Sequence, residues 1–116
     1  LCARLRSERY VQNVFGYRGY FFDRMEGTIF NQAVAWVPQS TVACLINRGY
    51  RNIYNNHKQI QVLLQVHDSL AGQYPDTLEN GAALVKEACN VPLPYAEPLH
   101  IPVGIVTSKE SWGDCR

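Results

Sequence analysis

The feature that most constrains the fold is the stretch 59–66, in which nearly every second residue is apolar. Successive side chains of a β-strand point to opposite faces. Ile60, Val62, Leu64 and Val66 would therefore share one face of such a strand. The stretch predicts a strand.

A sharp turn is predicted directly after this strand, at His67-Asp68-Ser69. Residues 70–74 are few enough to form the returning strand, so the two stretches predict a hairpin with Asp68 at its exposed tip. A carboxylate held rigidly at such a tip can bind a divalent cation, and the two Mg²⁺ ions of phosphoryl transfer use carboxylates as ligands. Asp is also a common turn residue, and the dipeptide alone favours that simpler interpretation.

A second hairpin is predicted near the start of the chain. Residues 2–8 form a short polar stretch that can end a helix. The aromatic-rich segment 9–23 then divides into β-prone stretches at 10–15 and 20–22, separated by turn residues at 16–19.

Helical spacing of apolar residues is found from Ile29 to about Arg48. Thr28 is a suitable N-cap and Gly49 a suitable stop signal. Pro38 lacks an N–H and clashes with the preceding turn, so it is expected to kink or divide this helix. The polar residues 50–58 are expected to form a loop.

Further elements are expected towards the end of the chain. Residues 75–77 open a helix, whose apolar stripe is Leu78, Ala82, Val85 and Cys89. Residues 90–98 contain three prolines and are expected to be a loop. Residues 99–106 predict a final strand, with Pro102 indicating an edge position. Hairpins with segregated helices predict an α+β fold, in which antiparallel β-hairpins carry packed helices.

Composition limits the alternatives. The chain has 116 residues and a net charge of +1, which suits one domain or part of one and neither demands nor excludes a nucleic-acid partner. Its four cysteines form no closely spaced pair, so reduced thiols are expected rather than a zinc site. No apolar run reaches about 18 residues, so no membrane span is expected. Because the chain begins with Leu1, we expect it to be a piece of a longer protein.

Four short motifs follow one another along the sequence. They are Phe-Gly-Tyr-Arg at 15–18, Val-Pro-Gln-Ser-Thr-Val-Ala at 37–43, Leu-Gln-Val-His-Asp-Ser-Leu at 64–70, and the segment 105–114 with its Trp. In this order and at these separations they resemble four parts of family A DNA polymerases: the Gly-Arg-Arg turn that follows the fingers, the kinked helix, motif C, and the closing strand with its terminal Trp. The resemblance covers essentially residues 1–116, and the wording of the helix motif is most similar to the bacteriophage branch of the DNA polymerase I superfamily.

The resemblance implies a C-terminal palm fragment of a replicative nucleotidyltransferase. It implies that Asp68 is the second catalytic Asp and a ligand of a two-Mg²⁺ site. The same resemblance implies that His67 belongs to the catalytic site, near the primer 3′ end and its minor groove. It also implies that Gln39 donates to the minor groove and that Arg18 approaches the duplex. The partners implied are primer–template DNA, dNTP and the remaining polymerase with motif A, fingers and thumb. No membrane partner is implied, and the location expected is cytoplasmic, in the bacterial host if the parent is phage-encoded.

The sequence departs from the family pattern at two positions. Ser69 replaces the usual Glu, which puts any metal role of this position in doubt, and Tyr17 replaces the first Arg of the Gly-Arg-Arg turn. Motif A and the fingers helix are not found, so the chain alone is expected to be inactive, because one carboxylate does not assemble a two-metal site. A non-catalytic palm-like module that binds nucleic acid or protein stays open as an alternative. Metal-dependent phosphohydrolases with His-Asp dyads are disfavoured, since their dyads lie on helices.

Overall fold

The computed structural model describes residues 1–115 and contains four helices and four strands in that part of the chain. In chain order these are α1 (Cys2–Glu8), β1 (Tyr10–Gln12), β2 (Arg18–Tyr20), α2 (Gly27–Asn56), β3 (Gln61–Val66), β4 (Ser69–Gln73), α3 (Gly81–Ala88) and the 3₁₀ turn η1 (Trp112–Asp114). The strands form two separate antiparallel pairs, β1–β2 and β3–β4. This mixture of helices and antiparallel hairpins agrees with the predicted α+β class.

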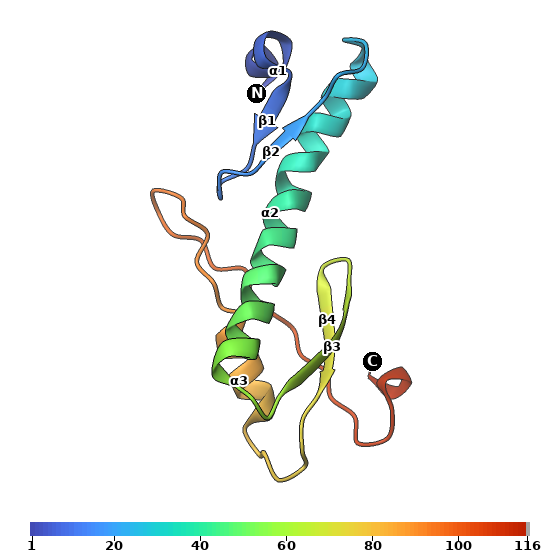
Figure 1. Cartoon of the computed structure of the whole chain (residues 1–116), viewed down its shortest axis with the longest axis vertical. Helices are drawn as coiled ribbons and strands as arrows, with labels where there is room; N and C mark the ends of the chain where they lie inside the picture. The colour runs from blue at the N-terminus through green and yellow to red at the C-terminus, as the bar shows by residue number, and fades with distance from the viewer. Residues whose placement is uncertain (116) are drawn as a thin grey trace.

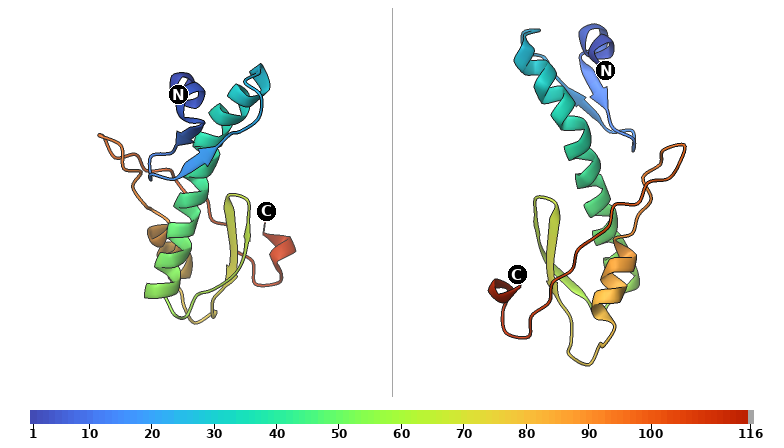
Figure 2. Two further views of the ribbon diagram at one scale, coloured as in Figure 1. Left: turned by 45° about the horizontal axis from the view of Figure 1, so that its top comes forward. Right: turned by 180° about the vertical axis from the view of Figure 1, so that it is seen from behind.

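Helix α2 forms the axis of the molecule (Figure 1). The β1–β2 hairpin and α1 lie along its N-terminal half, whereas β3–β4 and α3 lie along its C-terminal half (Figures 1 and 2). The chain extends over 56 × 31 × 20 Å, and its radius of gyration of 17.7 Å exceeds the ~13 Å expected for a compact domain of this length. The shape is therefore elongated, with one apolar cluster at each end of α2.

The N-terminal cluster is built from Leu5, Val11 and Ala33, all almost fully buried. Trp36 of α2 packs beside it. A Cβ on Gly19 would lie 2.5 Å from the Trp36 ring, so only glycine allows β2 to lie this close to the helix. The inner face of the first hairpin is thereby fixed against α2.

The C-terminal cluster joins α2, β3 and α3 through Ile53, Ile60, Ala88 and Cys89. A Cβ on Gly49 would lie 2.9 Å from Cys89 Sγ and 3.3 Å from Cys89 Cα. At Gly49 the backbone of α2 thus lies directly against Cys89, the residue that follows α3. Asn52 adds a hydrogen bond from Nδ2 to the Ala88 carbonyl at 2.9 Å.

Helix α2 is longer than the sequence predicted. It begins after the N-cap Glu26 instead of Thr28, and it continues through Gly49 to Asn56, so the predicted stop and the predicted 50–58 loop were both wrong. The reason is tertiary: the C-terminal cluster buries Ile53, which stabilises the last turns. Pro38 lies inside the helix and does not divide it.

The first turn and the last helix also differ from expectation. The loop of the β1–β2 hairpin lies at 13–17, because Asn13 Oδ1 accepts hydrogen bonds from the backbone N–H groups of Phe15 and Tyr17. Helix α3 begins at Gly81 and not at 75–77, which are separated from it by turns.

The strand predicted for 99–106 was wrong. In the part of the chain that the structure describes, this segment contributes only one isolated antiparallel bridge, Leu93 with Leu99. A single strand has no ladder without a neighbour, and Pro102 offers no N–H to one.

Helix α2 is long and apolar enough, by length and composition alone, to cross a membrane, although no segment was expected to qualify. This is weak evidence, because the core helix of a soluble protein passes the same test. Only 22% of its most apolar window is buried in this chain. Much of the helix surface is therefore uncovered by the other described elements.

Candidate active site at the β3–β4 turn

The β3–β4 hairpin closes with a two-residue loop. Val66 and Ser69 form the last pair of the ladder, which leaves His67 and Asp68 as the loop. His67 has a φ of 52°, in the left-handed region that two-residue hairpin loops require at their first position. Histidine is among the non-glycine residues that enter this region more readily than most. The prediction of a hairpin with Asp68 at its tip is confirmed.

Ser69 closes this turn through its hydroxyl, which donates to the Val66 carbonyl at 2.8 Å. The hydroxyl proton is thus used within the turn itself. Ser69, which stands where the family pattern has a Glu, therefore makes a hydrogen bond within the turn.

The ladder below the turn contains a β-bulge. Val62 pairs with Gly72 and Leu64 pairs with Ala71, so Leu63 is an extra residue on β3. A bulge shifts the alternation of faces and increases the local twist. The simple alternation expected over 59–66 is interrupted there.

The tip is exposed and carries a single carboxylate. His67, Asp68 and Ser69 are all exposed. Among the described residues, no group of three or more His, Cys, Asp or Glu side chains is placed to hold a metal ion. Asp68 therefore has the chemistry of a hard-cation ligand, but any complete site needs ligands from outside the described part of the chain.

Gln39 lies on the exposed surface of α2, next to Pro38. The two residues that follow it are anchored, because the hydroxyls of Ser40 and Thr41 both donate to the Val37 carbonyl, at 3.1 and 2.7 Å. The helix thus holds the Gln39 backbone rigidly and leaves its amide facing solvent.

Arg18 belongs to the other hairpin. Its Nε donates to Gln12 Oε1 at 3.1 Å, and its guanidinium lies 4.5 Å from the centre of the Tyr10 ring. The pKa of Arg18 is raised, mainly by its interaction with the Tyr20 side chain and to a lesser extent by Tyr10. The guanidinium is therefore a permanent cation.

The predicted site residues are spread along the molecule. The tip of β3–β4 lies to one side of α2 and the β1–β2 loop to the other, both from the front and from behind (Figures 1 and 2). No hydrogen bond between described residues joins Asp68, Gln39 and Arg18 to one another. All three side chains are exposed, as was predicted for Asp68, and the structure does not bring them into contact.

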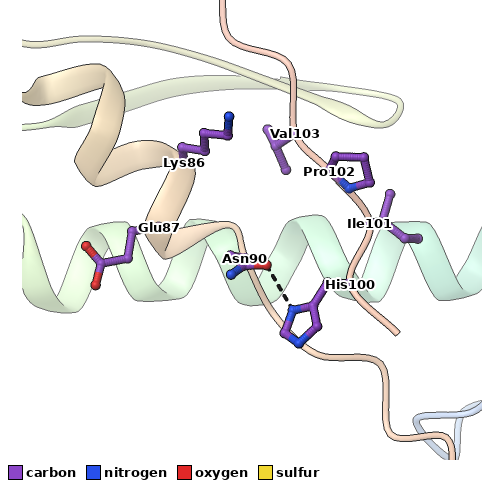
Figure 3. Close-up of a pocket in the computed structure, with 7 residues that line it drawn as sticks. All are labelled: Lys86, Glu87, Asn90, His100, Ile101, Pro102 and Val103. Atoms are coloured by element: carbon purple, nitrogen blue, oxygen red, sulfur yellow. Dashed lines mark hydrogen bonds between the residues drawn. The ribbon is translucent and has the colours of Figure 1, made fainter. Parts of the chain in front are cut away.

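An open groove of ≈ 480 Å³ lies elsewhere, between α3 and the segment 100–103 (Figure 3). His100 Nδ1 lies 2.9 Å from Asn90 Oδ1 across it, a contact that joins the segment to the chain just after α3. None of the predicted site residues lines the groove, so it belongs to the packing of the C-terminal segment.

Sequence reasoning passed over the side chains on the outer face of the first hairpin. Tyr20 and Phe22 are 54% and 78% exposed and their rings are stacked. The available signal was the alternation of large residues at 18, 20 and 22, which places them on one face of a strand.

Three curated proteins are similar in sequence to this chain. They are the thermostable DNA polymerases I of Thermus filiformis, Thermus thermophilus and Thermus caldophilus, each 33% identical over 113 residues. No family model matches the chain, and no solved structure matches it significantly. The matches cover 86% of this chain but only 13% of each polymerase. Over most of its length, this chain is therefore similar to one short part of DNA polymerase I.

Proposed function

We propose that the chain is the C-terminal palm piece of a family A DNA polymerase of the bacteriophage-like branch, and that Asp68 is one of its catalytic carboxylates. The observation that carries this proposal is the position of Asp68 at the tip of a two-residue hairpin loop, inside a chain similar to DNA polymerase I over 86% of its length. The parent would then catalyse template-directed nucleotidyl transfer from dNTPs during DNA replication.

The residues present fit part of a Mg²⁺ site. Asp68 supplies a hard oxygen ligand on a rigid turn, and Ser69 is engaged with Val66. Bound Mg²⁺ would activate the attacking oxygen and stabilise the leaving one. The chain's own contribution is to hold the Asp68 carboxylate in a fixed place through the left-handed turn at His67.

Three further side chains are proposed to contact primer–template DNA. An exposed amide at Gln39 can donate to minor-groove acceptors, which are nearly alike in all base pairs and therefore suit an enzyme that copies any sequence. His67 would lie near the primer 3′ end. The permanent cation of Arg18 suits a phosphate contact, which positions a duplex without reading its sequence.

The chain alone is proposed to be inactive, with the rest of the polymerase as its partner. Its elongated shape and the largely uncovered α2 support this, since an independent domain of this length would be more compact. Motif A, the fingers and the thumb would complete the site and cover α2.

Primer extension with Mg²⁺ tests the proposal, using the 116-residue chain, the parent polymerase and its Asp68→Asn variant. We expect no extension by the chain. In the parent, Asp68→Asn is expected to lower extension by more than about 100-fold, because even second-shell changes at metal sites cost about 10–100-fold. DNA binding by the variant should persist. Ser69→Ala is the matched control and should retain most of the activity; near-normal extension by Asp68→Asn excludes the role.

The alternative is a palm-like module that binds nucleic acid or protein without catalysis. The absence of a metal-ligand cluster among residues 1–115 favours it for the isolated chain. The same assay separates the two, because a parent without polymerase activity, but with DNA binding, would support the module. A metal-dependent phosphohydrolase is disfavoured further, since Asp68 lies in a hairpin loop and not in a helix.

A further inference from the structure

The β1–β2 hairpin has one face against α2 and one face in solvent. In the ladder, Tyr10 lies opposite Tyr20 and Gln12 lies opposite Arg18. Val11 and Gly19, one position along, point towards α2 and the N-terminal cluster. The alternation of a strand therefore places the side chains at 10, 12, 18 and 20 together on the outer face. Phe22 follows β2 and extends this face, because its ring stacks on Tyr20.

Three adjoining aromatic rings lie on this outer face, and two arginines lie over the ring at one end of the row. The Tyr20 and Phe22 rings stack with centroids 5.9 Å apart and planes 9° apart, and Tyr10 adjoins Tyr20 at 5.6 Å. Arg18 lies over the Tyr10 ring at 4.5 Å, and Arg4 of α1 approaches the same ring at 5.8 Å. The backbone N–H of Phe21 donates to the Arg9 carbonyl at 2.8 Å, which continues the pairing beyond β2 and holds this end of the hairpin.

The Phe22 ring is highly exposed and is not part of a cross-strand pair. Cross-strand pairing of Tyr10 with Tyr20 stabilises the sheet, but Phe22 has no partner opposite and is 78% exposed. One face of a large apolar ring is thus presented to solvent at the end of a stack. Such a ring offers a stacking surface for another flat group.

Charge is segregated towards the same end of the chain. Residues 1–24 contain five arginines and two acidic residues, a net +3, whereas residues 25–116 contain six basic and eight acidic residues, a net −2. The two values sum to the net charge of +1. The near-neutral total therefore conceals a basic N-terminal segment, which suits a polyanion.

We propose that the outer face of the β1–β2 hairpin, formed by Tyr10, Arg18, Tyr20 and Phe22, binds single-stranded nucleic acid by stacking bases on Phe22 and Tyr20 while arginines contact phosphates. Surfaces for single strands combine aromatic rings with a positive charge in this way. Bases in a duplex are already stacked on each other, so the exposed ring favours an unpaired strand. The binding needs neither Asp68 nor Mg²⁺ and does not rest on the proposed polymerase role.

Fluorescence anisotropy of a labelled thymidine oligonucleotide of about 12 nucleotides, within the known range of site sizes, tests this surface. The 116-residue chain is titrated at about 50 mM salt, where phosphate contacts are strong, with EDTA present and dNTP omitted. Phe22→Ala and Tyr20→Ala are each expected to raise Kd about tenfold, a size typical of losing one stacked base. Phe22→Tyr keeps the ring and should bind as the unmodified chain does.

Tyr54→Ala is the matched control. Tyr54 is 64% exposed, stacks on Tyr50 at 6.5 Å and has the Lys58 ammonium 4.4 Å from its ring centre, so it copies the chemistry on α2 away from the hairpin. Its Kd should be unchanged. Circular dichroism should show the same fold for every variant, because the rings removed are exposed.

Two further oligonucleotides test which parts of the strand, the bases or the sugars, contribute to binding. An abasic strand of equal length has the same phosphates but no base to stack on Phe22 or on Tyr20, so it should bind more than about tenfold more weakly, a larger loss than either alanine variant causes. A uridine RNA strand compared with the thymidine strand identifies which sugar is preferred, and binding of either supports the surface. The proposal is overturned if neither strand binds, if the abasic strand binds equally well, or if Phe22→Ala changes nothing. An equal loss in Tyr54→Ala would also overturn it.

Discussion

The side-chain amide of Asn13 donates a hydrogen bond to Ser40 Oγ at 3.1 Å and links the loop of the first hairpin to the middle of α2. Asn13 is only 3% exposed, and its carbonyl oxygen accepts from the backbone N–H groups of Phe15 and Tyr17. Ser40 is adjacent to Gln39. The hairpin that carries Arg18 and the helix that carries Gln39 are thus joined by one buried polar residue.

Replacing Asn13 with Ala should destabilise the fold by about 1–3 kcal/mol, because the change leaves the partly buried backbone N–H groups of Phe15 and Tyr17 without their acceptor. Ser40→Ala should cost less, since it removes one partner only. Thermal and urea unfolding of both single variants and the double variant would measure the coupling. If the two changes are additive, the hydrogen bond does not contribute to stability.

Gly49→Ala should also destabilise the chain, although alanine has the higher helix propensity by about 0.8–1 kcal/mol. The new Cβ would lie 2.9 Å from Cys89 Sγ, and forced repacking of this kind costs about 1–3 kcal/mol. Gly27→Ala is the matched control, because no atom lies within 4 Å of the Cβ it would add. Chemical denaturation should separate the two variants; equal behaviour would contradict the close helix contact.

Substitutions at His67 should separate the geometry of the turn from its chemistry. His67→Gly should leave stability unchanged or slightly raised, because glycine adopts a positive φ freely. His67→Val should lower it by about 1–2 kcal/mol, the approximate cost of a left-handed conformation for an L-residue. In the parent polymerase, His67→Gly should reduce primer extension despite the intact turn. Full extension by that variant would remove the proposed role of the imidazole.

Stability should fall at alkaline pH because of Cys89. Burial raises the pKa of its thiol in the folded chain, whereas the unfolded thiol ionises near about pH 8.5. The contribution to stability is therefore complete below about pH 8.5 and is lost as the pH rises towards the folded pKa. Thermal unfolding from pH 7 to 10 should show the decline, and Cys89→Ala should reduce it. Cys44→Ala should retain it, so a decline that depends on Cys44 instead would contradict this assignment.

Local patterns predicted the second hairpin well. Its two strands and the exposure of Asp68 follow from alternation and turn chemistry, which act between near neighbours. The predicted turn also included Ser69, which the structure places in β4, paired with Val66. The bulge at Leu63 did not follow, because it depends on how β3 pairs with Gly72 and Ala71 across the ladder.

Long-range contacts explain the errors. A glycine at position 49 is a common signal for the end of a helix. In the structure, however, the absence of a side chain at Gly49 makes room for Cys89, which is 40 positions away in the sequence. Likewise, the first turn lies at 13–17 instead of the predicted 16–19, because Asn13 is held by hydrogen bonds within the loop and to Ser40 on α2. The 99–106 segment has strand-like alternation, but backbone pairing requires a neighbour that the described residues do not supply.

The continuity of α2 through Pro38 fixes the rotational phase between the two ends of the molecule. Each residue of an α-helix advances about 1.5 Å and turns about 100°, so the N-terminal hairpin and the β3–β4 turn are set at one angle by the number of residues between Ala33 and Ile53. A single insertion there would rotate one end by more than a quarter turn while leaving each local cluster intact. The number of residues in the middle of α2 is thus constrained by the relative orientation of the two ends.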